Sequence, residues 1–451
     1  MGVLLALSGS VSCRAPAPVP VVPAVSESVP SDSADVCAGT TVFEASAPAT
    51  QPRHRDAQFW IQAATMDPDV EVMSREQIDA TNAIYSRNEE LFRDPLQLSA
   101  ADDATIRARW EQRSQWMRGK IDAGHYLEQT SGAMARATAR MDGAKPHAEF
   151  HVITHESALW CVPSMEGILS QARDAAFDRN RCTGLHPGEL VLATHAVDGE
   201  PWVHVEAGHS DGWLHAPQWT PPLARDEAHA FAHGTPRAYV VQETAPDAGG
   251  VDLRIGTSFP VSKTSDGPST LNVPASTGLQ ARPLDDTQLA PGPLPLTKRR
   301  LLELAFSRLG DAYGWGGYRG NRDCSRFVHD MLETFGVLMA RNSAAQALMG
   351  AKNIDLRGMT DPDKRQEITR LDARNVVLLY MPGHIMLYLG RDGDRHFALS
   401  SLSEYMRPCE GGGAQTVRLD RVEVTSLELG RGTPRTSFLE RLTTAVVFGP
   451  G

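Results

Sequence analysis

The sequence predicts a multidomain α+β protein, and three observations point to this class. The chain has 451 residues, which is enough for about three domains of ordinary size. Helical periodicity runs through residues 53–146, and from residue 147 short apolar runs alternate with Gly, Pro and Asp, as in small β-domains. Residues 294–451 combine amphipathic helices with strand-like runs. We therefore expect helical, β-rich and mixed units in that order.

Charge and hydropathy argue against two broad classes of function. The 44 Lys and Arg residues are outnumbered by 55 Asp and Glu residues, so the formal net charge is −11. A sequence-independent nucleic-acid binder needs a basic face to displace counterions, so we expect no nucleic-acid partner. No apolar run reaches the roughly 18–20 residues that span a bilayer, so we do not expect an integral membrane protein.

The N-terminal segment predicts export. Residues 1–13 form an apolar run that ends in small residues and Cys13, and they resemble the end of a lipoprotein signal peptide, although no Lys or Arg precedes the run. Residues 14–52 contain seven prolines and have the composition of an extended tether. These features predict a cell-envelope protein, periplasmic and lipid-anchored at Cys13. The alternative is an ordinary unstructured terminus.

Residues 53–146 are expected to form a helical N-terminal domain. Ser74 and Gln77 have the spacing of a capping box, which marks a helix start. A later helix carries apolar side chains on one face, and we expect them to be core rather than a ligand platform. These residues are Ile106, Trp110, Met117 and Ile121.

Two β-rich stretches follow, at residues 147–235 and 236–293. In the first, a strand after Leu185 leads through a turn to a strand with Trp202, and then to a Gly-Trp pair that ends at Trp213. This order of strands, turns and tryptophans resembles a bacterial SH3-like module. We expect two SH3-like β-barrels. The alternative is a pair of small β-domains of another type, because one sequence does not fix strand pairing.

Residues 294–451 are expected to form an α+β domain. Apolar residues recur with helical spacing over 301–309, and Gly310 supplies a C-terminal stop. After a glycine-rich turn, Cys324 opens a second amphipathic helix. Strand-like apolar runs follow at residues 376–380, 385–389 and 396–399.

Cys324 is the candidate nucleophile. It follows Asp323 at a predicted helix start, where exposed backbone N–H groups and the helix dipole favour a thiolate over a thiol. The thiolate is the reactive form of cysteine. Asp323 either caps this helix or binds substrate, and the local sequence leaves both roles open.

A cysteine nucleophile needs a base, and His384 and His396 are the candidates. Each begins a predicted strand, and a turn at Gly390 separates them. A plain antiparallel hairpin would place the two histidines at opposite ends. Bringing them together requires a twisted, offset or non-neighbouring pairing. For either histidine alone, a surface or satisfied core position is the alternative.

The other cysteines and the histidines show no familiar metal pattern. The six cysteines have no CxxC spacing and the 15 histidines include no HExxH, so we expect neither a metal nor a cofactor. Cys161 and Cys182 either pair in an oxidising compartment or stay as buried thiols. Cys409 is a rival nucleophile, but it lies in a loop without a helix start, so Cys324 is favoured.

The last third of the chain carries a set of motifs in a fixed order. They are Tyr313-x-Trp-Gly-Gly, Asp323-Cys324-Ser325, Gly383-His384-Ile-Met-Leu-Tyr-Leu-Gly and His396, with Arg341-Asn-Ser-Ala-Ala-Gln346 after the nucleophile helix. Together they resemble the NlpC/P60 family of cell-wall cysteine peptidases. The resemblance implies a papain-like NlpC/P60 catalytic domain over 294–451, preceded by two SH3-like β-barrels and a helical domain. This order of units is similar to that of γ-D-glutamyl-L-diamino-acid endopeptidases.

The resemblance also assigns catalytic roles. It implies that Cys324 is the nucleophile, that His384 is the general base and acid, and that His396 orients His384. The implied reaction is hydrolysis of the γ-D-glutamyl–diamino acid bond of peptidoglycan stem peptides through a thioester on the cysteine. Two alternatives stay open. One is a non-catalytic cell-wall-binding or scaffolding protein, and the other is a peptidoglycan amidase or transferase that uses the same cysteine.

Substrate-binding roles follow from the same resemblance. Tyr313 is expected beside the oxyanion or the substrate, and Asp323 and Ser325 are expected to hold the free amine of an N-terminal L-Ala. Glu189, in the first SH3-like module, is expected to add a carboxylate to that amine pocket; otherwise it is a solvated turn residue. Arg326 departs from the family, which usually has Gly there, and it either alters the cleft or reaches solvent.

Overall fold

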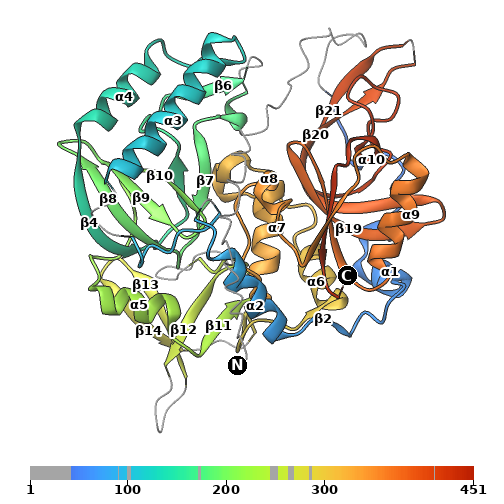
Figure 1. The fold of residues 1–451 in the computed structure, drawn as a ribbon, viewed down its shortest axis with the longest axis horizontal. Coiled ribbons are helices and arrows are strands. Elements are labelled where there is room, and N and C mark those ends of the chain that lie inside the picture. Colours follow the sequence, from blue (N-terminus) through green and yellow to red (C-terminus); the bar gives the residue numbers. More distant parts are fainter. Residues whose placement is uncertain are drawn as a thin grey trace, which may run out of the picture.

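The computed structural model describes residues 42–89, 91–98, 103–170, 174–243, 252–262, 269–283, 287–410 and 412–450. Cys13, the signal-like segment around it and most of the expected tether lie outside these residues. None of the helices in the described ranges combines the length and the apolar character needed to cross a membrane. Figure 1 shows the β-rich modules on one side of the molecule and the C-terminal domain on the other.

The largest sheet belongs to the C-terminal domain. It has seven strands in the order β1-β21-β20-β19-β18-β22-β17. Its neighbouring strands are antiparallel, except that β1 runs parallel to β21. The strands are β1 (Val42–Phe43), β17 (Lys352–Asp355), β18 (Val376–Met381), β19 (His384–Asp392), β20 (Arg395–Pro408), β21 (Ala414–Ser426) and β22 (Thr444–Phe448).

Helices cover both faces of this sheet, because strand side chains alternate between two apolar cores. Ile385 and Leu387 pack in one core with Phe327 of α7, whereas Met386 packs in the other with Ile368 of α9. The helices of this domain are α6 (Lys298–Phe306), α7 (Cys324–Glu333), α8 (Ser343–Gln346), α9 (Asp361–Asp372) and α10 (Phe438–Arg441). The expected helix at Cys324 and the three expected strands are confirmed.

A six-stranded sheet forms the larger β-rich module. Its strand order is β4-β8-β9-β10-β5-β7. The strands are β4 (Ala144–Val152), β5 (Ser157–Trp160), β7 (Arg181–Leu185), β8 (Leu190–Val197), β9 (Trp202–Ala207) and β10 (Ser210–His215). Trp160, Trp202 and Trp213 are buried against Trp110 and Met117 of α3. The predicted tryptophan-bearing strands are therefore present. Their tryptophan side chains pack against helix α3 as well as against one another.

A five-stranded sheet forms the second β-rich module, in the order β14-β13-β12-β11-β15. Its elements are β11 (Arg237–Val240), β12 (Ser258–Ser262), β13 (Thr270–Ala275), β14 (Gly278–Pro283) and β15 (Leu289–Ala290), with α5 (Arg225–His233) beside it. Among the described strands, neither module closes through a pairing between its first and last strands. The barrel closure expected for SH3-like modules is therefore not seen.

The helices of residues 53–146 do not share one core. The first two pack with the C-terminal domain and the last two with the six-stranded sheet. They are α1 (Ala57–Ala63), α2 (Arg75–Tyr85), α3 (Asp103–Asp122) and α4 (Ala133–Gly143), with the 3-10 helix η1 (Pro52–Arg55) before them. Ser74 and Gln77 form the predicted capping box of α2. The end of the expected tether is also part of the fold, since β1 pairs with β21.

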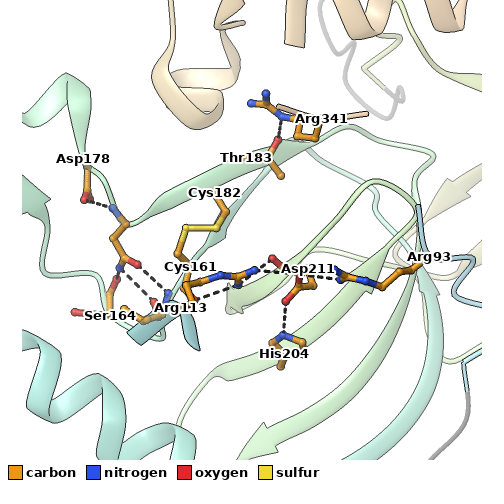
Figure 2. The surroundings of a disulfide bond; sticks show 12 residues. Arg93, Arg113, Cys161, Ser164, Asp178, Cys182, Thr183, His204, Asp211 and Arg341 are labelled. Carbon is orange, nitrogen blue, oxygen red and sulfur yellow. Dashed lines mark hydrogen bonds and ion pairs between the residues drawn. A yellow bond between two sulfur atoms is a disulfide. The ribbon is translucent and has the colours of Figure 1, made fainter. Parts of the chain in front are cut away.

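Short elements tie these units together. The strands β2 (Glu71–Met73) and β16 (Leu296–Thr297) pair with each other, as do β3 (Tyr126–Glu128) and β6 (Ile168–Ser170). The 3-10 helices η3 (Ala175–Phe177) and η4 (Trp315–Gly320) lie between β6 and α7 in the chain. A disulfide joins Cys161 to Cys182, whose Cα atoms are 5.1 Å apart (Figure 2).

Candidate active site

Cys324 is the first residue of α7, and the fold holds it firmly there. The side chain of Asp323 caps the helix by accepting a hydrogen bond of 2.8 Å from the backbone N–H of Arg326. The Cys324 thiol is 8% exposed, and its sulfur accepts a hydrogen bond from the backbone N–H of Ile385. Because Ile385 follows His384 at the start of β19, the thiol lies beside the strand that carries the expected base.

The electrostatics of Cys324 differ from the expectation. Burial and the neighbouring carboxylate of Asp323 raise the pKa of the thiol to about 12, against the opposing N–H of Ile385 and the charge of Arg341. The predicted thiolate is therefore wrong for the free protein. Removal from water penalises the charged sulfur more than the helix start stabilises it.

His384 begins β19 and is 7% exposed. Its Nε2 lies 3.1 Å from the hydroxyl oxygen of Ser400. When that hydroxyl accepts from Nε2–H, Nδ1 is the nitrogen that can take a proton. Burial lowers the pKa of His384 to about 3, and the charge of Arg441 adds to the decrease. The resting imidazole is therefore neutral, with one ring nitrogen unprotonated. No hydrogen bond joins it to the Cys324 thiol in the described structure.

His396 does not orient His384, and that prediction is wrong. β19 and β20 form an antiparallel hairpin in which His396 pairs with Arg391 and Leu399 pairs with Leu387, with a shift of register between Tyr388 and Gly390. His384 is at the far end of β19 from Arg391, so His396 is roughly seven residues, or about 23 Å, away along the strand. Its Nδ1 is instead 2.8 Å from the hydroxyl oxygen of Tyr388.

Ser400 occupies the position that His396 was expected to hold. It lies on β20 across from the beginning of β19, and its hydroxyl is buried against His384. The sequence signal for it is the register of the hairpin, since a residue beside the base must lie on β20 across from the first residues of β19. Tyr380 of β18 is a second residue near the thiol that the sequence did not indicate. Burial raises its pKa, and the nearby Cys324 adds to the increase.

Asp323 and Ser325 are held by Arg341. The guanidinium donates to both carboxylate oxygens of Asp323, with Nη1–Oδ1 at 3.0 Å and Nη2–Oδ2 at 2.7 Å. Nη1 also donates to the hydroxyl oxygen of Ser325 at 2.9 Å. Burial raises the pKa of Asp323, the charge of Arg341 lowers it, and the net shift is downward. The carboxylate is thus ionised but already neutralised by a buried partner.

Glu189 faces α7 across the module interface. Its Oε1 accepts 2.7 Å from Nη2 of Arg326, and its Oε2 is 2.9 Å from Nε2 of His209. Arg326 is only 2% exposed and also donates 3.1 Å to the carbonyl oxygen of Gly184. The residue that departs from the family therefore does not reach solvent. It joins the nucleophile helix to the six-stranded module through hydrogen bonds to Glu189 and Gly184.

Tyr313 precedes a tight loop that lies against the same module. Its ring stacks on Phe177 with centroids 5.7 Å apart, and its backbone N–H donates 2.8 Å to the carbonyl oxygen of Asp420. Gly317 has φ of 78°, and a Cβ there would lie 2.6 Å from the Cα of Gly184. Glycine is thus required where the loop touches β7.

Cys409 is not a competing thiol, because it is disulfide-bonded. Among the described residues, Cys324 is the free cysteine. Cys161 and Cys182 pair, which settles the alternative left open by the sequence. Thr183, next to Cys182, accepts a hydrogen bond of 2.5 Å from Nε of Arg341, so the disulfide-bearing strand also supports the residue that neutralises Asp323 (Figure 2).

Comparisons with known proteins concern residues 310–404 and the fold. Residues 310–404 match the model of the NlpC/P60 family. No curated protein matches the chain. A solved NlpC/P60 endopeptidase from Photobacterium damselae subsp. piscicida is similar in fold, with a TM-score of 0.69 and 12% identity over 91% of this chain and 100% of that one.

A Bacillus cereus ATCC 10987 NlpC/P60 family protein aligns at a TM-score of 0.43 with 16% identity, over 67% of this chain and 100% of that one. The matched region contains Tyr313, Cys324 and His384. Members of the family are generally cell-wall cysteine peptidases. Residues 310–404 of this chain therefore form an NlpC/P60 family domain.

Proposed function

We propose that the chain is a cysteine endopeptidase that cleaves peptidoglycan stem peptides at the γ-D-glutamyl–diamino acid bond. The observation that carries this proposal is the free Cys324 thiol at a helix start, hydrogen-bonded to the backbone N–H beside His384. A thiol and an imidazole on neighbouring elements are the two groups that acyl transfer requires. The chain needs no metal or cofactor for that reaction.

The chemistry runs through a thioester. Nδ1 of His384 removes the Cys324 proton as the sulfur attacks the γ-glutamyl carbonyl carbon. In this proposal the backbone N–H of Cys324, at the start of α7, donates to the resulting oxyanion. His384 returns the proton to the departing amine of the diamino acid, and water then hydrolyses the thioester with His384 as base. Ser400 accepts from Nε2–H and keeps the imidazole in the required tautomer.

The pairing of Asp323 with Arg341 bears on the amine end of the substrate. A carboxylate that is already neutralised by a buried guanidinium attracts a ligand ammonium weakly. Glu189 is likewise paired, with Arg326. We therefore propose that a free N-terminal L-Ala is not strictly required, and that stem peptides still joined to glycan are accepted.

We further propose that the protein works in the cell envelope, that its β-rich modules are divergent SH3-like units, and that Cys13 carries a lipid. The disulfide between Cys161 and Cys182 and the disulfide-bonded Cys409 support an oxidising compartment. The disulfide joins β7 to the residue that follows β5, in the module that packs against α7. The modules then form part of the substrate cleft.

Product analysis tests the proposed bond. The wild type and Cys324→Ala are incubated with L-Ala-γ-D-Glu-diaminopimelate, with the corresponding tetrapeptide and with whole sacculi, and the products are identified by mass spectrometry. We expect L-Ala-γ-D-Glu or the glycan-linked dipeptide end from the wild type only. Cleavage at another bond would indicate an amidase or transferase, and intact substrates with both proteins would indicate a binding or scaffolding protein.

A further inference from the structure

A second group of ionisable side chains lies on β4 of the six-stranded sheet, away from Cys324. His147, Glu149 and His151 offer ligand atoms that all lie within 4.8 Å of one another. Nε2 of His147 is 3.0 Å from Oε2 of Glu149, and Nε2 of His151 is 3.5 Å from the same oxygen. The pairing of β4 with β8 shifts register between Pro146 and Glu149, and such a bulge re-aims the side chain of His147.

The orientation of His151 is fixed by two contacts. Its Nδ1 lies 2.9 Å from the backbone carbonyl oxygen of Thr220, which only accepts, so Nδ1 carries the proton. Its ring stacks on Trp219 with centroids 4.0 Å apart and an interplanar angle of 7°. The residue is 2% exposed. The imidazole is thereby locked in the tautomer whose Nε2 carries a lone pair.

The group that this lone pair faces is the carboxylate of Glu149, 3.5 Å away. Nε2 of His151 is buried without a hydrogen bond. The 3.5 Å between it and the Glu149 carboxylate exceeds the ~2.7–2.9 Å of a charge-assisted hydrogen bond, so no shared proton closes the gap. Two hydrogen-bond acceptors, Nε2 of His151 and Oε2 of Glu149, thus face each other where water is partly excluded. This arrangement is unfavourable unless a cation lies between them.

A divalent transition-metal ion fits this arrangement. A ligating histidine usually donates its other ring N–H to a carbonyl or carboxylate, as His151 does to Thr220. Two imidazole nitrogens and one carboxylate oxygen are a common zinc donor set. Bonds of ~2.0–2.1 Å in tetrahedral geometry put ligand atoms about 3.3 Å apart. The separations of 3.0 and 3.5 Å fall on either side of that value.

We propose that His147, Glu149 and His151 form a zinc-binding site on the first β-rich module. His147 and Glu149 are partly exposed, so the ion has an entry path and a coordination position open to water. This site is independent of the proposed peptidase chemistry, because none of its residues contacts Cys324 or His384.

A neighbouring cluster shows by contrast why this one suits a cation. His204, Glu206 and Asp211 also bring their ligand atoms together. Three guanidiniums already form ion pairs with the two carboxylates of that cluster, so a metal ion would be repelled. Those arginines are Arg93, Arg109 and Arg113, of which Figure 2 labels the first and last. No ion pair to an arginine or lysine is formed by Glu149 in the described structure.

Zinc binding to the full chain tests the proposal. The measurement is equilibrium dialysis with elemental analysis, in a Cys324→Ala background so that the free thiol does not compete for the ion. We expect one Zn²⁺ per chain, and we expect His147→Ala and Glu149→Gln each to raise the Zn²⁺ Kd by at least about 100-fold, beyond the ~10–100-fold typical of outer-shell changes. Both side chains are partly exposed, so these variants should fold, which circular dichroism checks.

His229→Ala is the matched control. His229 and His233 form a second imidazole pair on α5, with ring centroids 5.0 Å apart, and they could chelate an added ion without the β4 site. We expect His229→Ala to bind Zn²⁺ as the wild type does. Binding that persists in the double variant His147→Ala/Glu149→Gln, binding that is lost in His229→Ala, or no binding to the parent chain would each overturn the proposal.

Discussion

The Cys324 thiol and the His384 imidazole of the candidate site are both neutral at ordinary pH. Burial dominates both shifts, raising the pKa of Cys324 to about 12 and lowering the pKa of His384 to about 3. A pair of this kind transfers its proton only when the sulfur attacks, rather than resting as an ion pair. The reactivity of Cys324 in the absence of substrate should therefore be low.

Alkylation of Cys324 by iodoacetamide reports this state. Because the thiol pKa is raised, the thiolate fraction should grow about tenfold for each pH unit from about pH 7 to about pH 10, and the alkylation rate should follow without a plateau. Cys324→Ala corrects for labelling elsewhere. A rate that levels off below about pH 8 would contradict the neutral thiol and would indicate a preformed ion pair.

Ser400→Ala tests the assignment of the orienting residue. Loss of the hydroxyl removes the acceptor for Nε2–H of His384, so we expect kcat to fall by about 10–100-fold, less than the ~10⁴-fold for a buried carboxylate in that position. Ser400→Asn restores an acceptor and should recover part of the rate. His396→Ala is the control and should retain wild-type kcat, because His396 lies at the other end of the hairpin.

A residue's chemistry could be predicted from sequence where it depends on local order. Cys324 follows a capping Asp323 and begins a helix, and both features are visible in the sequence. The orienting role predicted for His396 is wrong, because that role depends on which residues of β19 and β20 pair. Hairpin register is set by turn geometry and by packing of both faces, and neither is contained in a count of residues.

At the scale of elements, α7 carries two different faces. Its apolar side packs on β19, whereas its polar side meets the β-rich modules through Arg326 and Asp330. Asp330 is fully buried and is shared by Arg322, Arg326 and His186. Removing one partner from such a buried set typically costs about 3–5 kcal/mol. The helix that carries the nucleophile is therefore fixed from both sides.

Glu333 at the end of α7 makes stability depend on pH. Burial raises its pKa from 4.5 to about 8, against a hydrogen bond from the backbone N–H of Met339. The folded protein thus keeps a proton that the unfolded chain has released. This contribution is complete below about pH 4.5 and is lost as pH rises through about 8.

Glu333→Gln should accordingly flatten the pH dependence. Its glutamine has no proton to lose, so the free energy of unfolding should fall less between about pH 5 and about pH 8 than in the wild type. Urea unfolding at the two pH values measures the difference. Equal slopes in both proteins would show that Glu333 is ionised in the folded state.

The HxExH pattern of β4 is an element-scale feature that differs from the familiar metal-binding patterns. CxxC and HExxH have loop and helix spacings, whereas His147, Glu149 and His151 recur at the two-residue spacing of a strand. The unpartnered nitrogen of His151 depends on Thr220 and Trp219, which are about 70 residues further along the chain. That signal exists only once the segment after β10 has folded back onto β4.

At the scale of the whole molecule, the β-rich modules and the C-terminal domain are in direct contact. They share an apolar core and form ion pairs with each other. Phe259 of β12 belongs to the same apolar core as Phe327 of α7. A Cβ at Gly256 would lie 2.7 Å from the Cα of Asp330, so the second module touches the nucleophile helix directly. The order of units was predictable from sequence texture, but this shared core was not, because contacts between distant segments leave no periodic mark.

The disulfide between Cys161 and Cys182 should contribute to the stability of the whole chain. It closes a loop across 21 residues of sequence separation, for which the chain-entropy model gives about 3 kcal/mol. We expect the double variant Cys161→Ser/Cys182→Ser to lose about that much unfolding free energy in urea. An unchanged midpoint would mean that the strands around the disulfide hold the loop without it.

The most direct test of the central claim is capture of the acyl-enzyme. Wild-type protein is mixed with excess L-Ala-γ-D-Glu-diaminopimelate or glycan-linked stem peptide, quenched in acid and analysed by intact-protein and peptide mass spectrometry. We predict an adduct equal to the acyl part of the substrate on the peptide that contains Cys324, and none in Cys324→Ala. Product formation by Cys324→Ala would contradict a thioester on Cys324. An adduct of the wild type on another residue would contradict it as well.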